Sequence, residues 1–337
     1  MKKSKRHPEY QYLDLLKDIL KHGTDKEVFF TPEIREQYER KGEKPPFIRS
    51  IFGYSMCFSV GEYFPLLTTK KVFFRGILHE LLWFLRGDTN IKYLVDRDVH
   101  IWDEWAWKRY HKLCREKNLP DMEQSEFIEK IKSEPEASPF VREWGDLIMA
   151  YGKMWRRWPA SDGRKIDQLG WMIEGLRDKP FRKSYVLSAW NPDFIYAMAS
   201  PGNSNEVPPF CHTTFQFAVT GDGTLNLGLY QRSADTFLGL PFNIASYSLL
   251  LRMVAQVTGL KVGDFVHNIG DAHIYSNHFE QVREQLSREP RLFPSLKLNS
   301  EKKEIDDFVF EDFALEGYDP HPAIRAEIAN IGGFEKK

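Results

Sequence analysis

The residue best suited to nucleophilic chemistry in this sequence is a cysteine. Cys211 is followed directly by His212, and Arg232 lies further along the chain in the segment Gln231-Arg-Ser233. The thiolate is the nucleophilic form of cysteine, and a nearby cation lowers the thiol pKa and increases the thiolate fraction. A free cysteine is more often a small buried hydrophobe, so the Cys-His pair alone also fits a structural role. The pair defines a candidate nucleophile that other motifs must support.

A carboxylate inside an apolar helix is the second candidate for chemistry. The stretch from Gly76 to Asp88 is apolar nearly all round, which predicts a helix buried on most sides, yet it contains Glu80. A buried carboxylate has a raised pKa that suits general acid and base catalysis. The alternative is a structural glutamate that a backbone or arginine partner satisfies.

Composition limits the function classes. The chain has 337 residues with 42% hydrophobic content, enough for one enlarged domain or two small ones. Its 47 basic and 48 acidic residues give a net charge of -1, without the basic footprint of a nucleic-acid-binding protein. No apolar h-region and no apolar run of about 18 residues occurs, so we expect a cytoplasmic protein that does not enter membranes. Cys57, Cys114 and Cys211 show neither a disulfide framework nor a metal-binding spacing, so no metal is expected.

The elements that position these groups follow from apolar periodicity and turn residues. Amphipathic or buried helices are predicted at 9–22, 76–88 and 242–258, and strands at 48–58, 183–191, 213–219, 224–231 and 265–268. Gly221-Asp-Gly223 predicts a hairpin, short strands follow residue 292, and residues 106–146 predict a helical surface insertion of two short helices. Together these elements predict an α+β domain over 1–337, with a mixed, largely antiparallel sheet packed by helices.

Several long motifs, in order, carry a family resemblance. They are Tyr230-Gln-Arg-Ser-Ala-Asp-Thr-Phe-Leu-Gly-Leu-Pro-Phe-Asn-Ile-Ala-Ser-Tyr247, Gly270-Asp-Ala-His-Ile-Tyr275, His79-Glu-Leu-Leu-Trp-Phe-Leu-Arg-Gly-Asp-Thr-Asn90, His100-Ile-Trp-Asp-Glu-Trp105 and Gly317-Tyr-Asp-Pro-His-Pro322. With Cys211 they closely resemble the thymidylate synthases, over most of residues 48–329. The resemblance implies an enzyme that methylates dUMP to dTMP, with 5,10-methylenetetrahydrofolate as carbon and hydride donor and no metal.

The resemblance also implies catalytic roles. The Cys211 thiolate would add to C6 of uracil and create an enolate at C5, with Arg232 as the cation that holds the thiol ionised. Glu80 would organise water for proton transfers at O4 and at the folate, and Tyr151 resembles the residue near the departing C5 proton. Asp235 resembles the carboxylate that accepts hydrogen bonds from the pterin ring.

Nucleotide contacts are implied in the same way. Asn243 carries one acceptor and one donor on a single amide, which match N3–H and O4 of uracil, whereas an aspartate would favour cytosine. His273 and Tyr275 are two residues apart on a predicted strand, so both point to one face and could hold the 3′-hydroxyl. Gln231 and Ser233 join Arg232 as substrate-binding residues. For the folate, the implied contacts are Trp102, Trp105 and Gly239 together with Asp235.

The sequence departs from the family at the phosphate and at the C-terminus. The family's Arg-Thr-Gly-x-Gly-Thr run is replaced by Glu43-Lys-Pro-Pro-Phe-Ile-Arg49, and its two arginines lent by the partner subunit are replaced by Lys183 and Ser184. Lysine binds phosphate as a point charge without the arginine fork. The candidates for compensating charge are Arg40, Lys44, Arg49 and Arg182. The resemblance implies a homodimer with a sheet face as its interface.

The C-terminal extension at 330–337 replaces the short apolar tail that closes over the folate in the family. Looser closure would let water trap the methylene intermediate before hydride transfer. The alternative activity is therefore a dUMP (pyrimidine nucleotide) 5-hydroxymethylase on the same scaffold. A catalytically silent nucleotide-binding protein is a third hypothesis.

Overall fold

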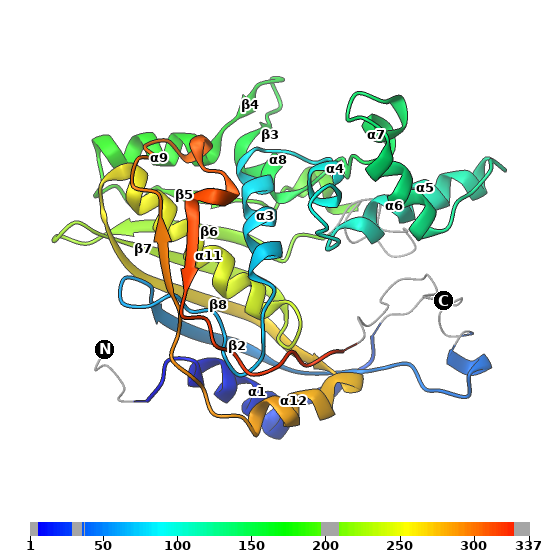
Figure 1. Ribbon diagram of the computed structural model, residues 1–337, viewed down its shortest axis with the longest axis horizontal. Helices are drawn as coiled ribbons and strands as arrows, with labels where there is room; N and C mark the ends of the chain where they lie inside the picture. Colours follow the sequence, from blue (N-terminus) through cyan, green and yellow to red (C-terminus); the bar gives the residue numbers. More distant parts are fainter. Residues whose placement is uncertain (1–5, 29–35, 37, 197–208, 327–337) are drawn as a thin grey trace.

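A mixed sheet organises the chain, which we describe from a computed structural model over residues 6–28, 36, 38–196 and 209–326 (Figure 1). Within these residues six strands follow the order β1-β2-β8-β7-β6-β5. β7 and β8 run parallel, and every other neighbouring pair is antiparallel. The strands are β1 (Thr24–Lys26), β2 (Ile48–Ser59), β5 (Val186–Ser188), β6 (His212–Val219), β7 (Thr224–Asp235) and β8 (Lys261–Tyr275), and the two-stranded pairs are β3 (Trp158–Pro159) with β4 (Lys165–Ile166) and β9 (Ser295–Leu298) with β10 (Phe313–Glu316).

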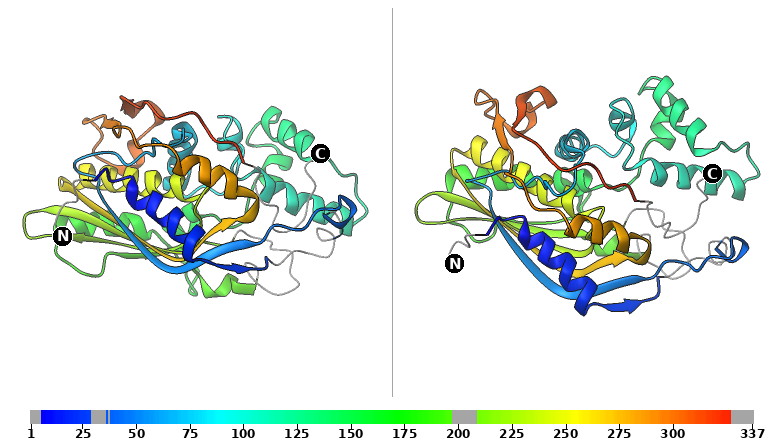
Figure 2. Two further views of the ribbon diagram at one scale, coloured as in Figure 1. Left: turned by 90° about the horizontal axis from the view of Figure 1, so that it is seen from below. Right: turned by 60° about the horizontal axis from the view of Figure 1, so that its bottom comes forward.

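Helices cover one face of this sheet. The longest, α11, begins with Pro241 in its first turn and ends at Gly259, whose φ of +70° is a left-handed cap that favours glycine. α1 and α12 lie side by side at one edge (Figure 2). The helices are α1 (Tyr10–His22), α3 (Phe74–Leu85), α4 (Lys92–Val95), α5 (Asp103–Glu116), α6 (Gln124–Ser133), α7 (Pro139–Trp144), α8 (Tyr151–Arg156), α9 (Gln168–Asp178), α11 (Leu240–Thr258) and α12 (Phe279–Leu286). Short 3-10 turns are η1 (Pro192–Phe194), η2 (Ser276–His278), η3 (Ile305–Asp307) and η4 (Phe310–Asp312).

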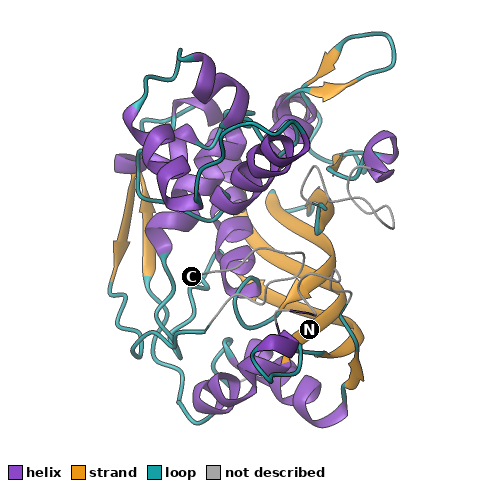
Figure 3. Ribbon diagram, turned by 90° about the vertical axis from the view of Figure 1, so that its right-hand side faces the viewer, coloured by secondary structure: helices purple, strands orange, loops and turns teal. Residues whose placement is uncertain are grey.

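The other face of the sheet is left open by these helices (Figure 3). Along β7 alternate residues such as Leu227 and Leu229 are buried, whereas Tyr230 is 45% exposed. On β2 the side chain of Phe52 is 79% exposed, and Val186 on β5 is 44% exposed. Large apolar side chains are therefore exposed on three strands.

Most predicted elements are confirmed, with three corrections. The predicted strand 183–191 is paired only at Val186–Ser188, and the predicted strand 265–268 is the middle of the much longer β8. β8 pairs on both sides, with β2 and with β7, so its ladder hydrogen bonds hold polar residues and glycines that strand propensity disfavours. The helical insertion contains three helices, not two, and begins at Asp103. The third, α7, forms because Ser138 caps it through the amide of Val141 (3.1 Å) and a proline follows in its first turn.

The insertion has a small aromatic core of its own, to the side of the sheet (Figure 1). The ring of Tyr110 lies 5.2 Å from Phe127 and 5.9 Å from Phe140, and Phe127 lies 5.7 Å from Phe140. This cluster joins α5, α6 and α7 to one another. Trp102, which belongs to the site described below, is the residue before α5.

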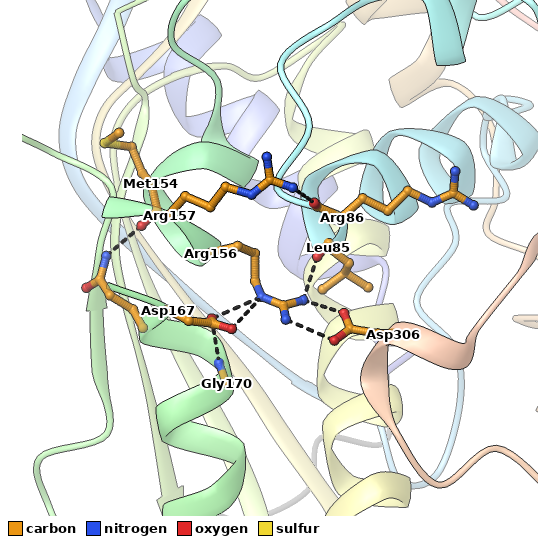
Figure 4. A network of polar contacts seen from close by, with 9 residues as sticks. Leu85, Arg86, Met154, Arg156, Arg157, Asp167, Gly170 and Asp306 are labelled. Carbon is orange, nitrogen blue, oxygen red and sulfur yellow. Dashed lines mark hydrogen bonds and ion pairs between the residues drawn. The ribbon is translucent and has the colours of Figure 1, made fainter. Parts of the chain in front are cut away.

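One arginine ties together the helices that carry the site (Figure 4). At the end of α8, Arg156 donates to the carbonyl of Leu85 at the end of α3 (2.6 Å), and it forms ion pairs with Asp167 and Asp306. Desolvation opposes its charge, yet the two carboxylates outweigh burial and raise the pKa of Arg156. α3, α8, the start of α9 and η3 are therefore held in a fixed relation.

None of the described helices combines the length and apolar character needed to cross a membrane. Within the same ranges no group of three or more His, Cys, Asp or Glu side chains is arranged to hold a metal. The C-terminal extension at 330–337 lies outside the described residues.

Candidate active site

Cys211 lies immediately before β6, against the first residue of α8. Its backbone amide donates to the hydroxyl of Tyr151 at 2.8 Å, and the amide of His212 donates to the same oxygen at 3.2 Å. The Tyr151 ring also stacks on His212, with centroids 4.8 Å apart. On the other side the carbonyl of Cys211 accepts from the amide of Arg232 at 2.9 Å. Tyr151 therefore fixes the backbone of the cysteine that the sequence singled out.

The Arg232 guanidinium lies beside this cysteine but is held by the backbone. Its Nε donates to the carbonyl of Phe210 at 2.8 Å and an Nη to that of Pro209 at 3.4 Å, while the group lies 5.5 Å from the centre of the Trp190 ring. Burial raises the pKa of the Cys211 thiol, and the charge of Arg232 lowers it by less. Desolvation of the thiolate therefore outweighs the effect of the Arg232 charge in this chain, and the role of Arg232 in ionising the thiol stays a prediction.

Glu80 projects from α3 and is held by an indole. Its Oε1 accepts from Nε1 of Trp102 at 2.8 Å. Desolvation raises the pKa of Glu80 to about 7, although the indole hydrogen bond lowers it in part. The Trp102 ring lies 6.2 Å from that of Tyr151, so an acid able to exchange protons at neutral pH and the cysteine share one aromatic wall.

A buried chain of amides and histidines runs under this wall. Nε2 of Gln231 donates to Oδ1 of Asn243 at 3.0 Å, and Oε1 of Gln231 pairs with Nε2 of His267 at 2.8 Å. Desolvation lowers the pKa of His212 to about 4, although the neighbouring Asn243 side chain raises it in part. Asn243 lies in the first turn of α11 and joins β6, β7 and β8 through these partners.

Asp235 ends β7 just ahead of α11. Its Oδ1 accepts from the amides of Phe237 and Leu238, both at 3.0 Å, which leaves Oδ2 as an acceptor. Gly239 caps α11, and an added Cβ would meet the carbonyl of Asp235 at 3.4 Å. At the start of α11 this turn thus presents a carboxylate oxygen of Asp235 and the backbone of Gly239.

His273 and Tyr275 lie on one face at the end of β8, as their spacing predicts. Their rings are 5.4 Å apart, and Nδ1 of His273 is 3.1 Å from Oδ1 of Asp271. Asp271 also pairs with Lys26 at 2.6 Å and faces Ser233 in the β7–β8 register. The sugar-binding candidates and Ser233 therefore gather at one end of the sheet.

Most of the cationic side chains expected to bind the phosphate either pair with a carboxylate or lie exposed away from the cysteine site. Arg49 pairs with Asp25 at 2.6 Å, and Arg40 pairs with Glu36 at 3.1 Å. Lys44, Arg182 and Lys183 are exposed, and the carbonyl of Lys183 accepts from Gln216 at 3.0 Å. Trp105 is half-buried, with Lys108 Nζ 5.5 Å from its ring centre. Within this single chain none of these charges joins the cysteine site.

The sequence did not single out Lys70, although it lies in the site. Lys70 is 7% exposed, its ammonium donates to the carbonyl of Phe237, and its Nζ lies 3.6 Å from the centre of the Phe237 ring. Desolvation lowers the pKa of Lys70 to about 7, although the charge of Asp235 raises it in part. Its loop is anchored by the fully buried Glu9, which accepts from the amide of Thr69 at 2.8 Å. In the sequence only the adjacent Thr68-Thr69 pair could have pointed to Lys70. A lysine that lies beside a carboxylate from a distant part of the chain leaves no local sequence pattern.

A comparison with protein families agrees with this geometry. The family model described as thymidylate synthase matches residues 10–330 of the chain. The match spans the sheet, the insertion and every candidate site residue named above. The fold, the thiol, the acid of raised pKa and this match lead to one conclusion: the chain belongs to the thymidylate synthase family.

Proposed function

We propose that this protein converts dUMP to dTMP by reductive methylation with 5,10-methylenetetrahydrofolate, through addition of the Cys211 thiolate to C6 of uracil. The observation that carries the proposal is the single wall formed by Cys211, Tyr151, Trp102 and Glu80. Tyr151 holds the Cys211 backbone, and its ring lies near Trp102, which binds a carboxyl with a pKa of about 7; these contacts support the proposal.

Each protein group has a step that suits it. C5 of uracil is a poor carbon nucleophile, and addition of sulfur at C6 makes C5 an enolate carbon. The Arg232 charge favours the thiolate that starts this step, and Glu80 exchanges protons through water at O4. In this proposal the hydroxyl of Tyr151, which accepts from the Cys211 amide, is the group near the departing C5 proton. Asn243 reads the uracil edge.

The residues expected to contact the folate suit that ligand. Trp102 is 8% exposed and, with Trp105, offers an apolar wall, while Asp235 keeps one carboxylate oxygen free for ring N–H donors. Gly239 lets the α11 start approach a ligand closely. The folate supplies the one-carbon unit and, for methylation, the hydride. Lys70 lies beside Asp235 and adds a second polar group to this side.

A symmetric homodimer would complete the site. The apolar side chains of Phe52, Tyr230 and Val186 are exposed on three strands of the sheet, and burying them against a second copy would remove apolar area from water. In this proposal Lys183 of the partner subunit supplies phosphate charge that the single chain does not gather. His273, Tyr275 and Ser233 hold the sugar end.

A direct assay separates this activity from the alternatives. Purified protein is mixed with dUMP carrying tritium at C5 and with methylenetetrahydrofolate, while dihydrofolate absorbance and released tritium are both recorded. Methylation predicts that the two rise together. Tritium release without dihydrofolate identifies the 5-hydroxymethylase, which releases tetrahydrofolate, and neither signal identifies a silent binding protein.

A further inference from the structure

The loop that joins α4 to α5 brings Trp102 to the acid of the site. Trp102 is the last residue before α5, and its indole N–H donates to Oε1 of Glu80 at 2.8 Å. The Trp102 side chain does not cap the helix that it precedes. The position of this indole therefore depends on what else holds the loop and the first turn of α5.

A buried carboxylate in that first turn relies on a histidine from the loop. Asp103 is 5% exposed, and its Oδ2 lies 2.7 Å from Nδ1 of His100. A carboxylate can only accept, so Nδ1 of His100 carries the hydrogen. The other oxygen, Oδ1, is buried without a hydrogen-bond partner in the described part of the chain. His100 thus compensates a carboxylate whose burial is costly.

The two groups differ in their access to water. The His100 side chain is 49% exposed, whereas that of Asp103 is 7% exposed. Burial raises the pKa of Asp103, and the hydrogen bond from His100 lowers it in part. Without His100 the carboxylate is best solvated by turning outward to water, and such a turn displaces Trp102, its neighbour in the chain.

The other charged groups around the loop restrain it less. Asp98, within electrostatic range of His100, pairs with Lys132 of α6 at 2.7 Å, and both side chains are exposed. Exposed ion pairs contribute little to stability, although this one holds a residue with a φ of +53°, which a non-glycine residue adopts at a cost. Glu80 itself faces Tyr247 from α11.

We infer that His100 is a positioning residue, which acts through Asp103 to hold the start of α5 so that the Trp102 indole stays hydrogen-bonded to Glu80. The inference rests on the proposed function, in which Glu80 exchanges protons. The indole donor favours the ionised carboxylate and lowers the pKa of Glu80. Loss of His100 should therefore make Glu80 release its proton at a higher pH than in wild type.

The test observes the Trp102 indole by nitrogen-15 NMR, on full-length protein labelled at its nine tryptophans and free of nucleotide and folate. The resonance is the one missing in Trp102→Phe, and in wild type it should titrate near pH 7. In His100→Leu its midpoint should rise by about one pH unit, the shift for one lost hydrogen bond to a charged group, and its amplitude should fall. An unchanged titration in His100→Leu overturns the inference.

A matched control contains the same pair of groups further along α5. Nδ1 of His111 pairs with Oδ2 of Asp121 at 2.5 Å. His111→Leu should lower stability and leave the titration of Trp102 unchanged. Equal shifts in His111→Leu and His100→Leu would show a general loosening of α5 and overturn the inference. His100→Asn places an N–H where Nδ1 lies and should keep the wild-type midpoint.

A double-mutant cycle tests the route through Asp103. Asp103→Asn removes the buried negative charge, so the addition of His100→Leu to it should shift the midpoint little further. Shifts that simply add would mean that His100 acts without Asp103, and would overturn the inference. The expected titrations in a protein that shows no turnover would contradict the proposed function alone, because the NMR measurement needs no substrate.

Discussion

Removing the hydroxyl of Tyr151 should loosen the backbone of Cys211. In Tyr151→Phe the amides of Cys211 and His212 lose their shared acceptor, now at 2.8 and 3.2 Å. Each buried amide left without a partner costs about 1–3 kcal/mol, so with two amides the variant should lose roughly 2–6 kcal/mol of unfolding free energy. The phenyl ring can keep its packing on His212 and Phe210, both 4.8 Å away, so the fold should survive.

Two measurements test this expectation. Urea unfolding gives the stability loss, and peptide mass spectrometry after iodoacetamide treatment gives the alkylation rate of Cys211. Tyr185→Phe is the matched control, because the buried Tyr185 hydroxyl contacts the carbonyls of Gly175 and Lys179 at 2.6 Å. It should lower stability without changing Cys211 alkylation. Unchanged stability together with unchanged alkylation in Tyr151→Phe would refute the reasoning.

Other substitutions test the electrostatics of the site. Glu80→Gln keeps an acceptor for Trp102 and should lower turnover by about 10²- to 10⁴-fold. The pH-rate profile of wild type should have a limb near pH 7, and the profile of the variant should lack it. Folding raises the pKa of Glu80 from 4.5 to about 7, so the stability that protonated Glu80 contributes is lost as pH rises from 4.5 to about 7. Over this range wild type should lose about 1–3 kcal/mol of unfolding free energy relative to Glu80→Gln, measured by urea unfolding at the two pH values. The pKa of Lys70 is lowered from 10.5 to about 7, so wild type should gain stability relative to Lys70→Met as pH rises from 7 toward 10, and a pH-independent difference would contradict its burial. Asn243→Asp should raise dCMP affinity relative to dUMP, and calorimetry that finds no change would exclude Asn243 as the base reader.

The strongest periodic patterns predicted their elements because burial and local sequence agree there. The apolar faces of α1 and α11 and the Gly221–Gly223 turn between β6 and β7 are set by residues close in sequence. β8 was underestimated, since its polar residues are held by partners on two strands that lie far away in the chain. Tertiary pairing overrides local preference in such a strand.

The site was predictable to the extent that motifs carry it. The family resemblance identified Cys211, Tyr151 and Glu80, but it did not predict the contacts that connect them. The direction of the thiol pKa depends on how deeply Cys211 is buried, which no local pattern contains. The same reason hid the buried ammonium of Lys70 and the contact of His267 with Gln231, because each depends on partners from distant strands and loops.

A covalent trap tests the central claim, nucleophilic addition of Cys211 to the pyrimidine ring. The 5-fluoro analogue of dUMP cannot release its C5 substituent as a cation, so a complex formed with methylenetetrahydrofolate should stall after sulfur has added to C6. Peptide mass spectrometry should then find the nucleotide and the folate together on the peptide that contains Cys211, and nothing in Cys211→Ser. No adduct in wild type, or an adduct on Cys57 or Cys114 instead, would contradict the account.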